Sequence, residues 1–149
     1  MLILAKIKLT KAWLGDQQPG NDGVRRFQKS GNLLKVNDAV WRAQFKEAAA
    51  NLHLRINDSA IQPPRELLPA SIHLYTRHYS QVKVDYFESF RKGTVLNIQF
   101  LVKESEVPAP SLEQFTQLLK FVGQWLGLSP WGNKFGYGTF DVLETQTTV

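Results

Sequence analysis

The stretch from residue 123 to residue 141, GQWLGLSPWGNKFGYGTFD, combines five glycines with five aromatic residues. Glycine lets the backbone approach a ligand closely, and exposed aromatic rings offer flat faces on which bases stack. Backbone N–H groups here would contact phosphates while the rings stack on bases. In the alternative interpretation, the rings cover the open end of the hydrophobic core or form a subunit contact. The candidate ligand-binding residues of this stretch are Trp131, Lys134, Phe135, Gly136, Tyr137 and Gly138.

A basic loop supplies the second set of candidates. The segment from 14 to 32 is rich in Gly, Asn, Asp, Gln and Pro, which is typical of a long loop. It mixes cations that reach phosphates with a ring that can stack on a base: Arg25, Arg26, Phe27 and Lys29. Arg42 and Lys46 share one face of the following helix and extend this basic strip. The alternative is a solvated, flexible loop without a ligand.

Histidines are the remaining candidates for chemistry. A metal-independent ribonuclease can use a histidine as general acid or base, and His53 and His78 are the candidates for that role. Their spacing matches no catalytic motif. Neither a His-x-x-x-His pair nor a carboxylate cluster is present in the sequence, so we expect no metal site and no cofactor.

The composition is typical of a globular protein with one domain. Its 149 residues suffice for a hydrophobic core, and 43% of them are hydrophobic, so we predict one domain over 1–149. No apolar run reaches the roughly 20 residues of a membrane span, and the opening MLILAKIKL is too short for a signal peptide. The absence of cysteine excludes disulfides and thiol chemistry and fits a cytoplasmic protein.

The charge balance favours a polyanionic partner. The chain has 18 Lys and Arg against 13 Asp and Glu, a net charge of +5, and the excess is concentrated in residues 1–55. A positive surface releases counterions from a phosphate backbone when it binds nucleic acid.

Period-two alternation predicts the strands that must position these residues. In the opening LILAKIKL, one face is apolar and the other carries Lys6 and Lys8. Residues 91–93 join two extended runs like a hairpin turn, so these runs should pair antiparallel. The expected strands span 2–9, 72–90, 94–103 and 139–143, with a frayed tail over 144–149.

Two helices are expected between these strands. The first follows Asn37 or Asp38 as N-cap and covers 39–53. The second begins after a capping box of Ser111 and Gln114 and ends at Gly127. The resulting order predicts an α+β, ferredoxin-like βαββαβ fold: an antiparallel sheet, two helices on one face, and the glycine-rich loop before the last strand.

Two stretches then carry a resemblance to a known family. GLSPWGNKFGYGTFDV stands where that family has a glycine-rich loop, and the basic VRRFQKSGN leads into the helix VWRAQFKEAAANL. On these grounds the chain resembles the RAMP superfamily, the RNA-binding ferredoxin-like proteins of CRISPR systems, and looks most like small phage-encoded relatives of their backbone subunits. The resemblance implies the cytoplasm of a bacterial host, and RNA contacts by Gly127, Gly132, Gly136, Gly138 and Lys134, with Arg25 and Arg26.

The expected function is non-catalytic binding of single-stranded nucleic acid, RNA or DNA, with salt-dependent affinity and little sequence preference. A homo-oligomer along the strand is the expected assembly, and no membrane is an expected partner. One alternative is a protein-interaction or oligomerisation module of a phage or mobile element. A second alternative is a small metal-independent endoribonuclease that uses His53 or His78.

Overall fold

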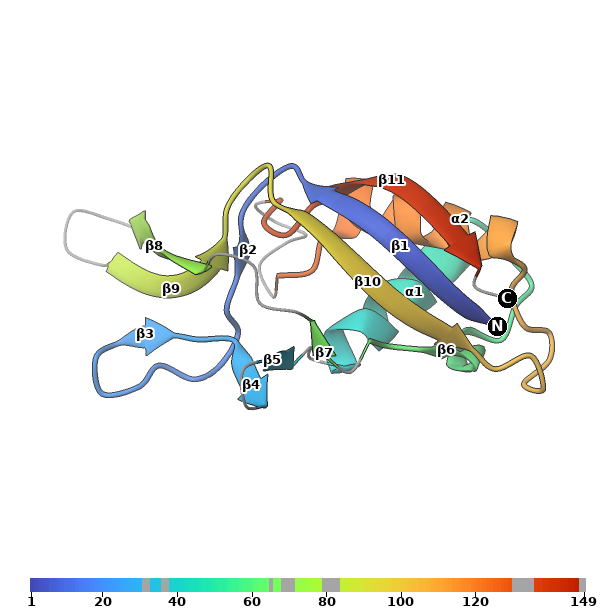
Figure 1. The fold of residues 1–149 in the computed structure, drawn as a ribbon, viewed down its shortest axis with the longest axis horizontal. Helices are drawn as coiled ribbons and strands as arrows, with labels where there is room; N and C mark the ends of the chain where they lie inside the picture. The colour runs from blue at the N-terminus through green and yellow to red at the C-terminus, as the bar shows by residue number, and fades with distance from the viewer. Residues whose placement is uncertain are drawn as a thin grey trace.

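The computed structural model of the protein describes residues 1–30, 33–35, 38–64, 66–67, 72–78, 84–129 and 136–147. The molecule is elongated, with a large sheet and two helices at one end and smaller sheets at the other (Figure 1). The N-terminus and the end of the last strand, β11 (Phe140–Thr147), lie at the end that holds the large sheet. Within the described ranges, no helix combines the length and the apolarity needed to cross a membrane.

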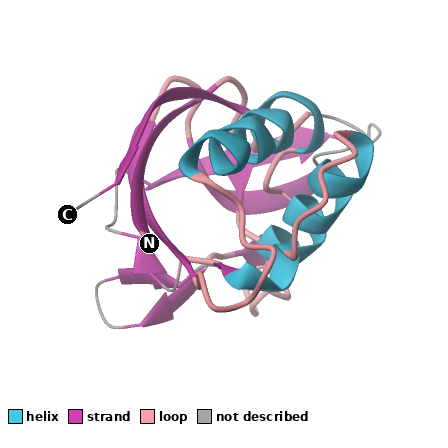
Figure 2. Cartoon of the chain, turned by 90° about the vertical axis from the view of Figure 1, so that its right-hand side faces the viewer, coloured by secondary structure: helices cyan, strands magenta, loops and turns pink. Residues whose placement is uncertain are grey.

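The main sheet has the chain order and the packing of a ferredoxin-like fold. In chain order, its elements are β1 (Leu2–Leu9), α1 (Asp38–Asn51), β6 (Ile61–Gln62), β10 (Val95–Val102), α2 (Leu112–Phe121) and β11 (Phe140–Thr147). The strands pair antiparallel in the spatial order β11-β1-β10-β6. Both helices cover the same face of this sheet (Figure 2). The prediction of an α+β, ferredoxin-like fold is therefore confirmed.

Alternation along the strands separates a core face of the main sheet from an open face. On β1, Ile3 and Ile7 are buried beneath the helices, whereas Lys6 and Lys8 are exposed on the opposite side. On the core face, the ring of Phe100 on β10 contacts aromatic rings from both helices. Its ring centroid lies 5.2, 5.8 and 5.0 Å from those of Trp41, Phe45 and Phe115. These contacts hold both helices to the sheet.

The second helix begins with the predicted capping box. The Ser111 Oγ accepts a hydrogen bond from the Gln114 backbone N–H at 3.1 Å, and the Gln114 Oε1 accepts one from the Ser111 N–H at 3.0 Å. After α2, the chain continues as a π-helical turn, η2 (Val122–Leu126), which ends at Gly127 with a φ of 74°. A Cβ at Gly123 would lie 2.4 Å from the carbonyl oxygen of Phe140, so glycine lets this turn lie against β11. The prediction that the helix ends at Gly127 is confirmed.

Two inserted segments build the second end of the molecule, on the left of Figure 1. One lies between β1 and α1, and the other between β6 and β10. They form one sheet in the order β2-β9-β3, with β8 paired to β9, and a small sheet in the order β4-β5-β7. The strands are β2 (Trp13–Leu14), β3 (Val24–Arg25), β4 (Gln28–Ser30), β5 (Leu33–Lys35), β7 (Glu66–Leu67), β8 (Ile72–His78) and β9 (Val84–Phe90), and a 3-10 turn, η1 (Asp58–Ala60), precedes β6.

The expected hairpin between residues 72–90 and 94–103 is wrong. The run 72–90 contains two strands, β8 and β9, which pair with each other from Ile72 opposite Phe90 to His78 opposite Val84. Gly93 turns the chain with a φ of 88°, but β10 then enters the main sheet instead of pairing with β9. The physical reason is that β1 offers β10 a partner whose apolar residues alternate in the same register. The short β6 takes the sheet position expected for 72–90.

The ends of two elements also differ from the expectation. The last strand, β11, extends to Thr147, so the frayed tail predicted for 144–149 is wrong over 144–147. Pairing with β1 and a contact of 2.7 Å between the Thr116 and Thr145 hydroxyls order this part of the chain. Residues 148 and 149 lie outside the described ranges. The first helix covers Asp38–Asn51, close to the predicted 39–53, and Asn37 also lies outside the described ranges.

Candidate nucleic-acid interface

A cleft of about 420 Å³ lies where the two ends of the molecule meet. Its walls come from the segment after β1, from the β8–β9 hairpin and from the turn that leads into β10. We call it the basic cleft. It combines apolar and aromatic walls with cations, which is the chemistry that base stacking and phosphate binding require. Its lining residues are Lys11, Ala12, His73, Leu74, Tyr75, Ser89, Arg91 and Lys92.

Two tyrosines tie the hairpin to the glycine-rich stretch beside the basic cleft. The hydroxyl oxygens of Tyr75 and Tyr137 lie 3.0 Å apart, and their rings meet edge to face at a centroid distance of 5.6 Å. The Nζ of Lys11 lies 4.3 Å from the centroid of the Tyr137 ring, a cation–π distance. The hydrogen bond with Tyr137, together with partial burial, raises the pKa of Tyr75 to about 12. The Tyr75 hydroxyl is therefore protonated at neutral pH.

Strand alternation turns three polar side chains of β8 toward the same side. His73, Tyr75 and Arg77 occupy alternate positions and share one face of the strand. His73 lies opposite Ser89 of β9, and the Ser89 hydroxyl donates a hydrogen bond to the His73 carbonyl oxygen at 3.0 Å. Because Ser89 is only 1% exposed, this bond fixes the inner wall of the basic cleft.

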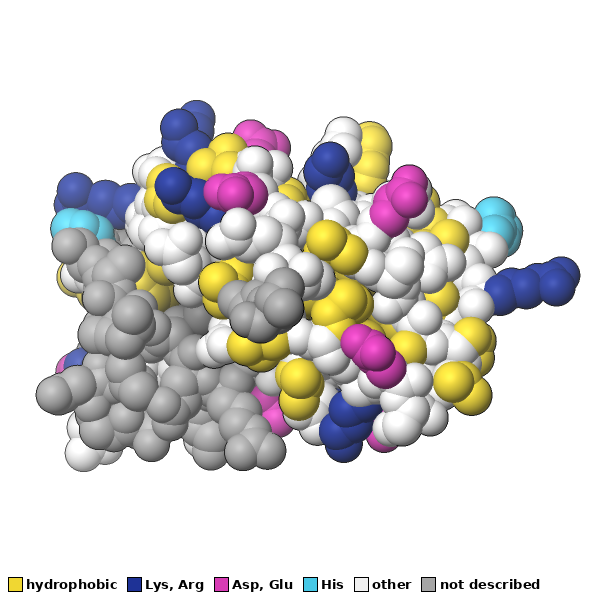
Figure 3. Space-filling view, turned by 45° about the vertical axis from the view of Figure 1, so that its right-hand side comes forward, with side chains coloured by type: hydrophobic (Ala, Val, Ile, Leu, Met, Phe, Trp, Pro, Cys, Tyr) yellow, Lys and Arg dark blue, Asp and Glu magenta, His cyan; other side chains and the backbone are white. Residues whose placement is uncertain are grey.

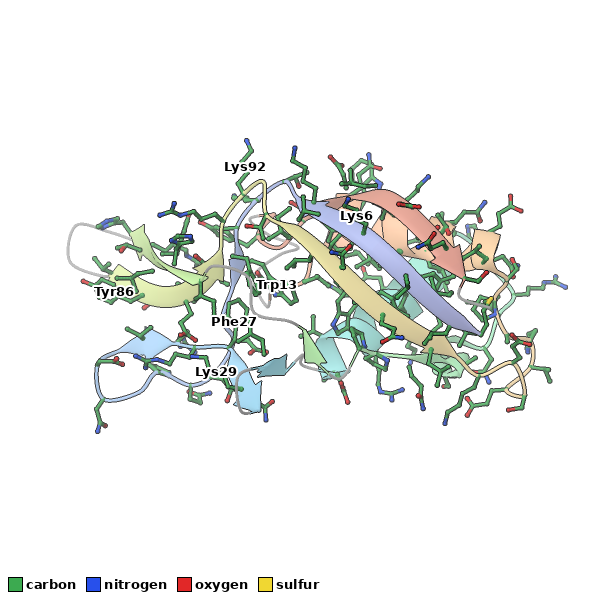
Figure 4. All side chains as sticks on the ribbon, viewed as in Figure 1. Lys6, Trp13, Phe27, Lys29, Tyr86 and Lys92 are labelled. Carbon is green, nitrogen blue, oxygen red and sulfur yellow. The ribbon has the colours of Figure 1, made fainter. Side chains whose placement is uncertain are left out.

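Arg91 and Lys92 form the cationic rim of the basic cleft. Both are exposed, and they directly follow β9. Hydrogen bonds hold their turn beside β1, from the Gly93 N–H to the Leu9 carbonyl at 2.7 Å and from the Leu9 N–H to the Thr94 carbonyl at 2.9 Å. Figure 4 shows Lys92 projecting outward from this turn. Among the described residues, neither Arg91 nor Lys92 forms an ion pair.

The charge elsewhere on the molecule is more mixed. Figure 3 shows Lys and Arg side chains at the upper left of that view with acidic side chains among them, and further Lys and Arg side chains at its right and lower edges. On the open face of the main sheet, Lys6 lies opposite Glu144 and Lys8 opposite Asp141 in the register of β1 and β11. The sheet face thus has balanced charge.

The glycine-rich stretch is anchored at its base, next to the basic cleft. The Gly138 N–H donates to the Ala12 carbonyl at 2.8 Å, so it is not available to a phosphate, contrary to the prediction. Gly138 has a φ of 77°, and a Cβ there would lie 2.6 Å from the backbone nitrogen of Ser129. Tyr137 is buried, with 8% of its surface exposed, so its ring packs inside the protein instead of offering a stacking face. A Cβ on Gly136 would lie 3.7 Å from the Cδ of Lys11, which places that residue near the cleft.

The tip of the glycine-rich stretch lies outside the described residues. This part covers 130–135 and includes Trp131, Gly132, Lys134 and Phe135. The roles expected for these residues stay predictions. Trp125, at the end of the preceding helical segment, is 62% exposed and so faces solvent rather than the core.

Phe27 does not offer the exposed stacking ring that its place in the basic loop predicted. It is 8% exposed, and its ring centroid lies 5.7 Å from that of Trp13 and 5.0 Å from that of Phe90. Figure 4 shows Trp13 and Phe27 close together between the two ends of the molecule. The physical reason for the correction is that burying this large ring stabilises the second lobe, the end of the molecule that the two inserted segments build, more than exposing the ring would.

The cations of the basic loop are largely committed to acidic partners. The Arg26 guanidinium pairs with the Asp22 carboxylate, and this hydrogen bond lowers the pKa of Asp22 to about 2. Lys29 Nζ lies 2.8 Å from the Oε2 of Glu88. Arg25 is half-buried in β3, which pairs with β9. The basic loop therefore has fewer cations available for phosphates than its sequence suggested.

The other predicted candidates lie apart from the basic cleft. Arg42 and Lys46 are exposed on α1, and neither lines the cleft. His53 follows α1 with a φ of 53°, and His78 is the exposed last residue of β8. Within the described part of the chain, no group of three or more His, Asp or Glu side chains is placed to hold a metal ion.

Sequence reasoning missed the lining of the basic cleft. Lys11, His73, Tyr75, Arg91 and Lys92 come from three segments that only the fold brings together. One signal in the sequence could have been used: Arg91 and Lys92 are adjacent cations in a turn that ends at Gly93. Residues of such connecting turns lie on the surface. Nothing in the spacing of these residues indicates that position 11 lies near positions 75 and 92.

Comparisons with known proteins support the fold. No protein-family model and no curated protein matches the sequence. The structure is similar to a chain in the cryo-EM structure of the type III-B Cmr-beta bound to cognate target RNA, with a TM-score of 0.64 and 11% sequence identity. The similarity covers 97% of this chain and 59% of that chain, so this chain spans less than two thirds of its structural neighbour. At such low identity, the comparison shows a shared fold.

Proposed function

We propose that the protein binds single-stranded RNA at the basic cleft without cutting it. The observation that carries the proposal is the meeting of cations with apolar and aromatic walls in one cleft, beside the base of the glycine-rich stretch. The net charge of +5 favours a polyanion. The fold shared with a chain from an RNA-bound type III-B Cmr-beta structure supports RNA as that polyanion.

The lining of the cleft suggests how a strand binds. Arg91 and Lys92 are placed to contact phosphate oxygens, because they project at the rim and have no ion pair among the described residues. Tyr75 and Leu74 offer apolar surface to a base, and Leu74 is 65% exposed. Contacts of this kind act on the backbone and on the face of any base, so we expect little sequence preference.

The placement of the glycine-rich stretch supports a relationship to the RAMP superfamily. In both, the stretch connects the second helix to the last strand of a ferredoxin-like sheet, here α2 and β11.

Fluorescence anisotropy titrations test the proposed function. Single-stranded RNA, single-stranded DNA and duplex DNA are titrated at two salt concentrations. Removing both rim cations, Arg91→Gln with Lys92→Gln, should weaken RNA binding about a hundredfold or more, because each charge-assisted contact contributes about 1.5–3 kcal/mol. The control variant Lys103→Gln with Lys120→Gln removes the same charge from exposed positions outside the cleft.

Two results would contradict the proposed function. Absence of binding to all three nucleic acids at low salt would remove nucleic-acid binding altogether. Cleavage of the RNA that persists in EDTA and disappears on substitution of His53 or His78 by Ala would favour the ribonuclease alternative. In the proposed function, the RNA is recovered intact after incubation.

A protein-contact role for the open face of the main sheet is the second candidate, and it is compatible with RNA binding. Val95 and Leu101 are 41% and 40% exposed on the open face of β10, and Leu143 is 51% exposed at the register shift of the edge strand β11. Exposed apolar side chains that lie together on one face are typical of protein interaction surfaces. We propose a second copy of this chain as the partner. Leu101→Glu with Leu143→Glu should then shift a dimer to monomer in light scattering, and a wild-type protein that is already monomeric at high concentration would contradict it.

A further inference from the structure

The basic cleft has the size of a site for one small molecule. Its volume of about 420 Å³ lies near the lower end of the roughly 300–1,000 Å³ typical of ligand pockets. The cleft is divided between apolar and aromatic walls, from Ala12, Leu74 and Tyr75, and cations, from Lys11, Arg91 and Lys92. A nucleotide has the same division, with flat apolar base faces and an anionic phosphate. A single nucleotide therefore matches the cleft better than a run of several.

Three cations line this cleft, whereas four cations on either side of it lie opposite or beside acids. On the main sheet, Lys6 and Lys8 lie opposite Glu144 and Asp141 in the cross-strand register. In the second lobe, two more cations are held in ion pairs, Arg26 with Asp22 and Lys29 with Glu88. Proteins that follow a long single strand use a groove whose positive charge tracks the backbone. Here Lys11, Arg91 and Lys92 instead line one cleft, and Arg42 and Lys46 lie apart from it on α1.

A local cluster of cations should bind a terminal phosphate of a nucleic acid more tightly than an internal one, because the two differ in charge. A phosphomonoester at the end of a strand carries about −1.5 to −2 charges at neutral pH, because its second pKa is about 6. A phosphodiester within the strand carries one charge. Lys11, Arg91 and Lys92 around one nucleotide-sized volume complement a dianion better than a monoanion.

We infer that the basic cleft is an end-binding site, which holds the terminal nucleotide of a strand with its phosphomonoester at Lys11, Arg91 and Lys92 and its base against Tyr75. This inference rests on the proposed RNA-binding function and adds which part of the strand the cleft recognises. It also accounts for the apolar wall, because a terminal base is free to leave the stack and enter a pocket. The ligand is a terminal phosphomonoester, from either the 5′ or the 3′ end.

Three RNAs of one sequence test the inference. They carry a 5′-phosphate, a 3′-phosphate or hydroxyls at both ends, with a fluorescent label at an internal position. We expect one of the phosphorylated RNAs to bind about tenfold more tightly than the hydroxyl form, because charge-assisted hydrogen bonds strengthen with the charge of the acceptor. The comparison between the two phosphorylated forms identifies the end. A nucleoside monophosphate with the phosphate at that end should compete for the cleft, and the nucleoside alone should not.

Variants assign this preference to the cleft. Arg91→Gln with Lys92→Gln should reduce the preference for the terminal phosphate from about tenfold to about twofold or less. Lys103→Gln with Lys120→Gln removes the same charge elsewhere and should leave the tenfold preference in place. All four positions are exposed, so both variants should unfold at the wild-type denaturant midpoint.

The outcomes separate this inference from the function on which it rests. Equal affinity for the three RNAs overturns end binding and leaves single-stranded RNA binding standing. A preference that survives Arg91→Gln with Lys92→Gln overturns the assignment to the basic cleft. Failure of every single-stranded RNA to bind at low salt overturns the proposed function, and the inference with it.

Discussion

At the scale of single residues, Phe27 illustrates how an aromatic residue in a basic loop can serve packing. Its ring fills the space between Trp13 and Phe90 and is almost fully buried. Phe27→Ala should therefore lower the free energy of unfolding by about 3–5 kcal/mol, the usual cost of removing a buried ring. Urea denaturation measures this loss. Weaker RNA binding with unchanged stability would instead return Phe27 to the role of a base-stacking residue.

Tyr75 gives the structure a pH dependence. Its hydrogen bond with Tyr137 raises the pKa of Tyr75 from 10.0 to about 12. The folded state therefore holds this proton more tightly than the unfolded state does. The stabilisation is complete below pH 10 and is lost as the pH rises toward 12, since the folded pKa is the higher one.

Ultraviolet absorbance of tyrosinate checks this assignment during an alkaline titration. In the wild-type protein, a tyrosinate signal should still develop near pH 12, where Tyr75 ionises. In Tyr137→Phe, Tyr75 loses its hydrogen-bond partner, so its pKa should fall toward the ordinary value. A late titration that persists in the variant would mean that burial alone raises the pKa of Tyr75.

At the scale of elements, the base of the glycine-rich stretch packs closely against the backbone after the second helical segment. Gly138 has a φ of 77°, and a Cβ there would overlap the backbone of residues 128 and 129. Gly93 also has a positive φ, of 88°, but nothing lies within 4 Å of the position of its Cβ. The two glycines thus share a backbone conformation and differ in the space around them.

Because of this difference, alanine substitutions at the two glycines form a matched pair of variants. Gly93→Ala should cost about 1 kcal/mol of stability, from the left-handed backbone alone. Gly138→Ala should cost about 3 kcal/mol or more, because overpacking against the backbone adds to the same strain. Denaturant unfolding of both variants gives the comparison. Equal losses would show that the stretch can move away from Ser129 at little cost.

The sequence predicted those elements whose defining residues are neighbours in the chain. The capping box of Ser111 and Gln114, and Gly127 at the helix end, belong to neighbouring residues, and both are present in the structure. The alternation of residues 2–9 likewise defined β1. The division of 72–90 into two strands was not predictable from alternation, because β8 and β9 have the same period and pair mainly with each other.

At the scale of the whole molecule, the candidate site depends on how the two lobes meet. The Arg91–Lys92 turn is visible in the sequence as a turn, but its partners are not. Lys11 reaches the cleft through the segment after β1, and Tyr75 through an inserted hairpin. Long-range juxtaposition of this kind follows from tertiary packing, and no spacing rule encodes it. The buried ring of Phe27 is a second example, since its partners Trp13 and Phe90 are distant in sequence.

Salt dependence reports on the whole molecule, because net charge and local contacts affect it differently. For single-stranded nucleic acid, the logarithm of the binding constant falls with the logarithm of the salt concentration by about 0.7 for each phosphate charge neutralised. Removing two contacting cations, with Arg91→Gln and Lys92→Gln, should therefore reduce this slope by about 1.4. Lys103→Gln with Lys120→Gln lowers the net charge equally and should leave the slope nearly unchanged, because those cations lie outside the cleft. Anisotropy titrations at four or more salt concentrations, on the order of 0.05 to 0.3 M, measure both slopes. Equal reductions in the two variants would mean that overall charge attracts the RNA and that the basic cleft is not where it binds.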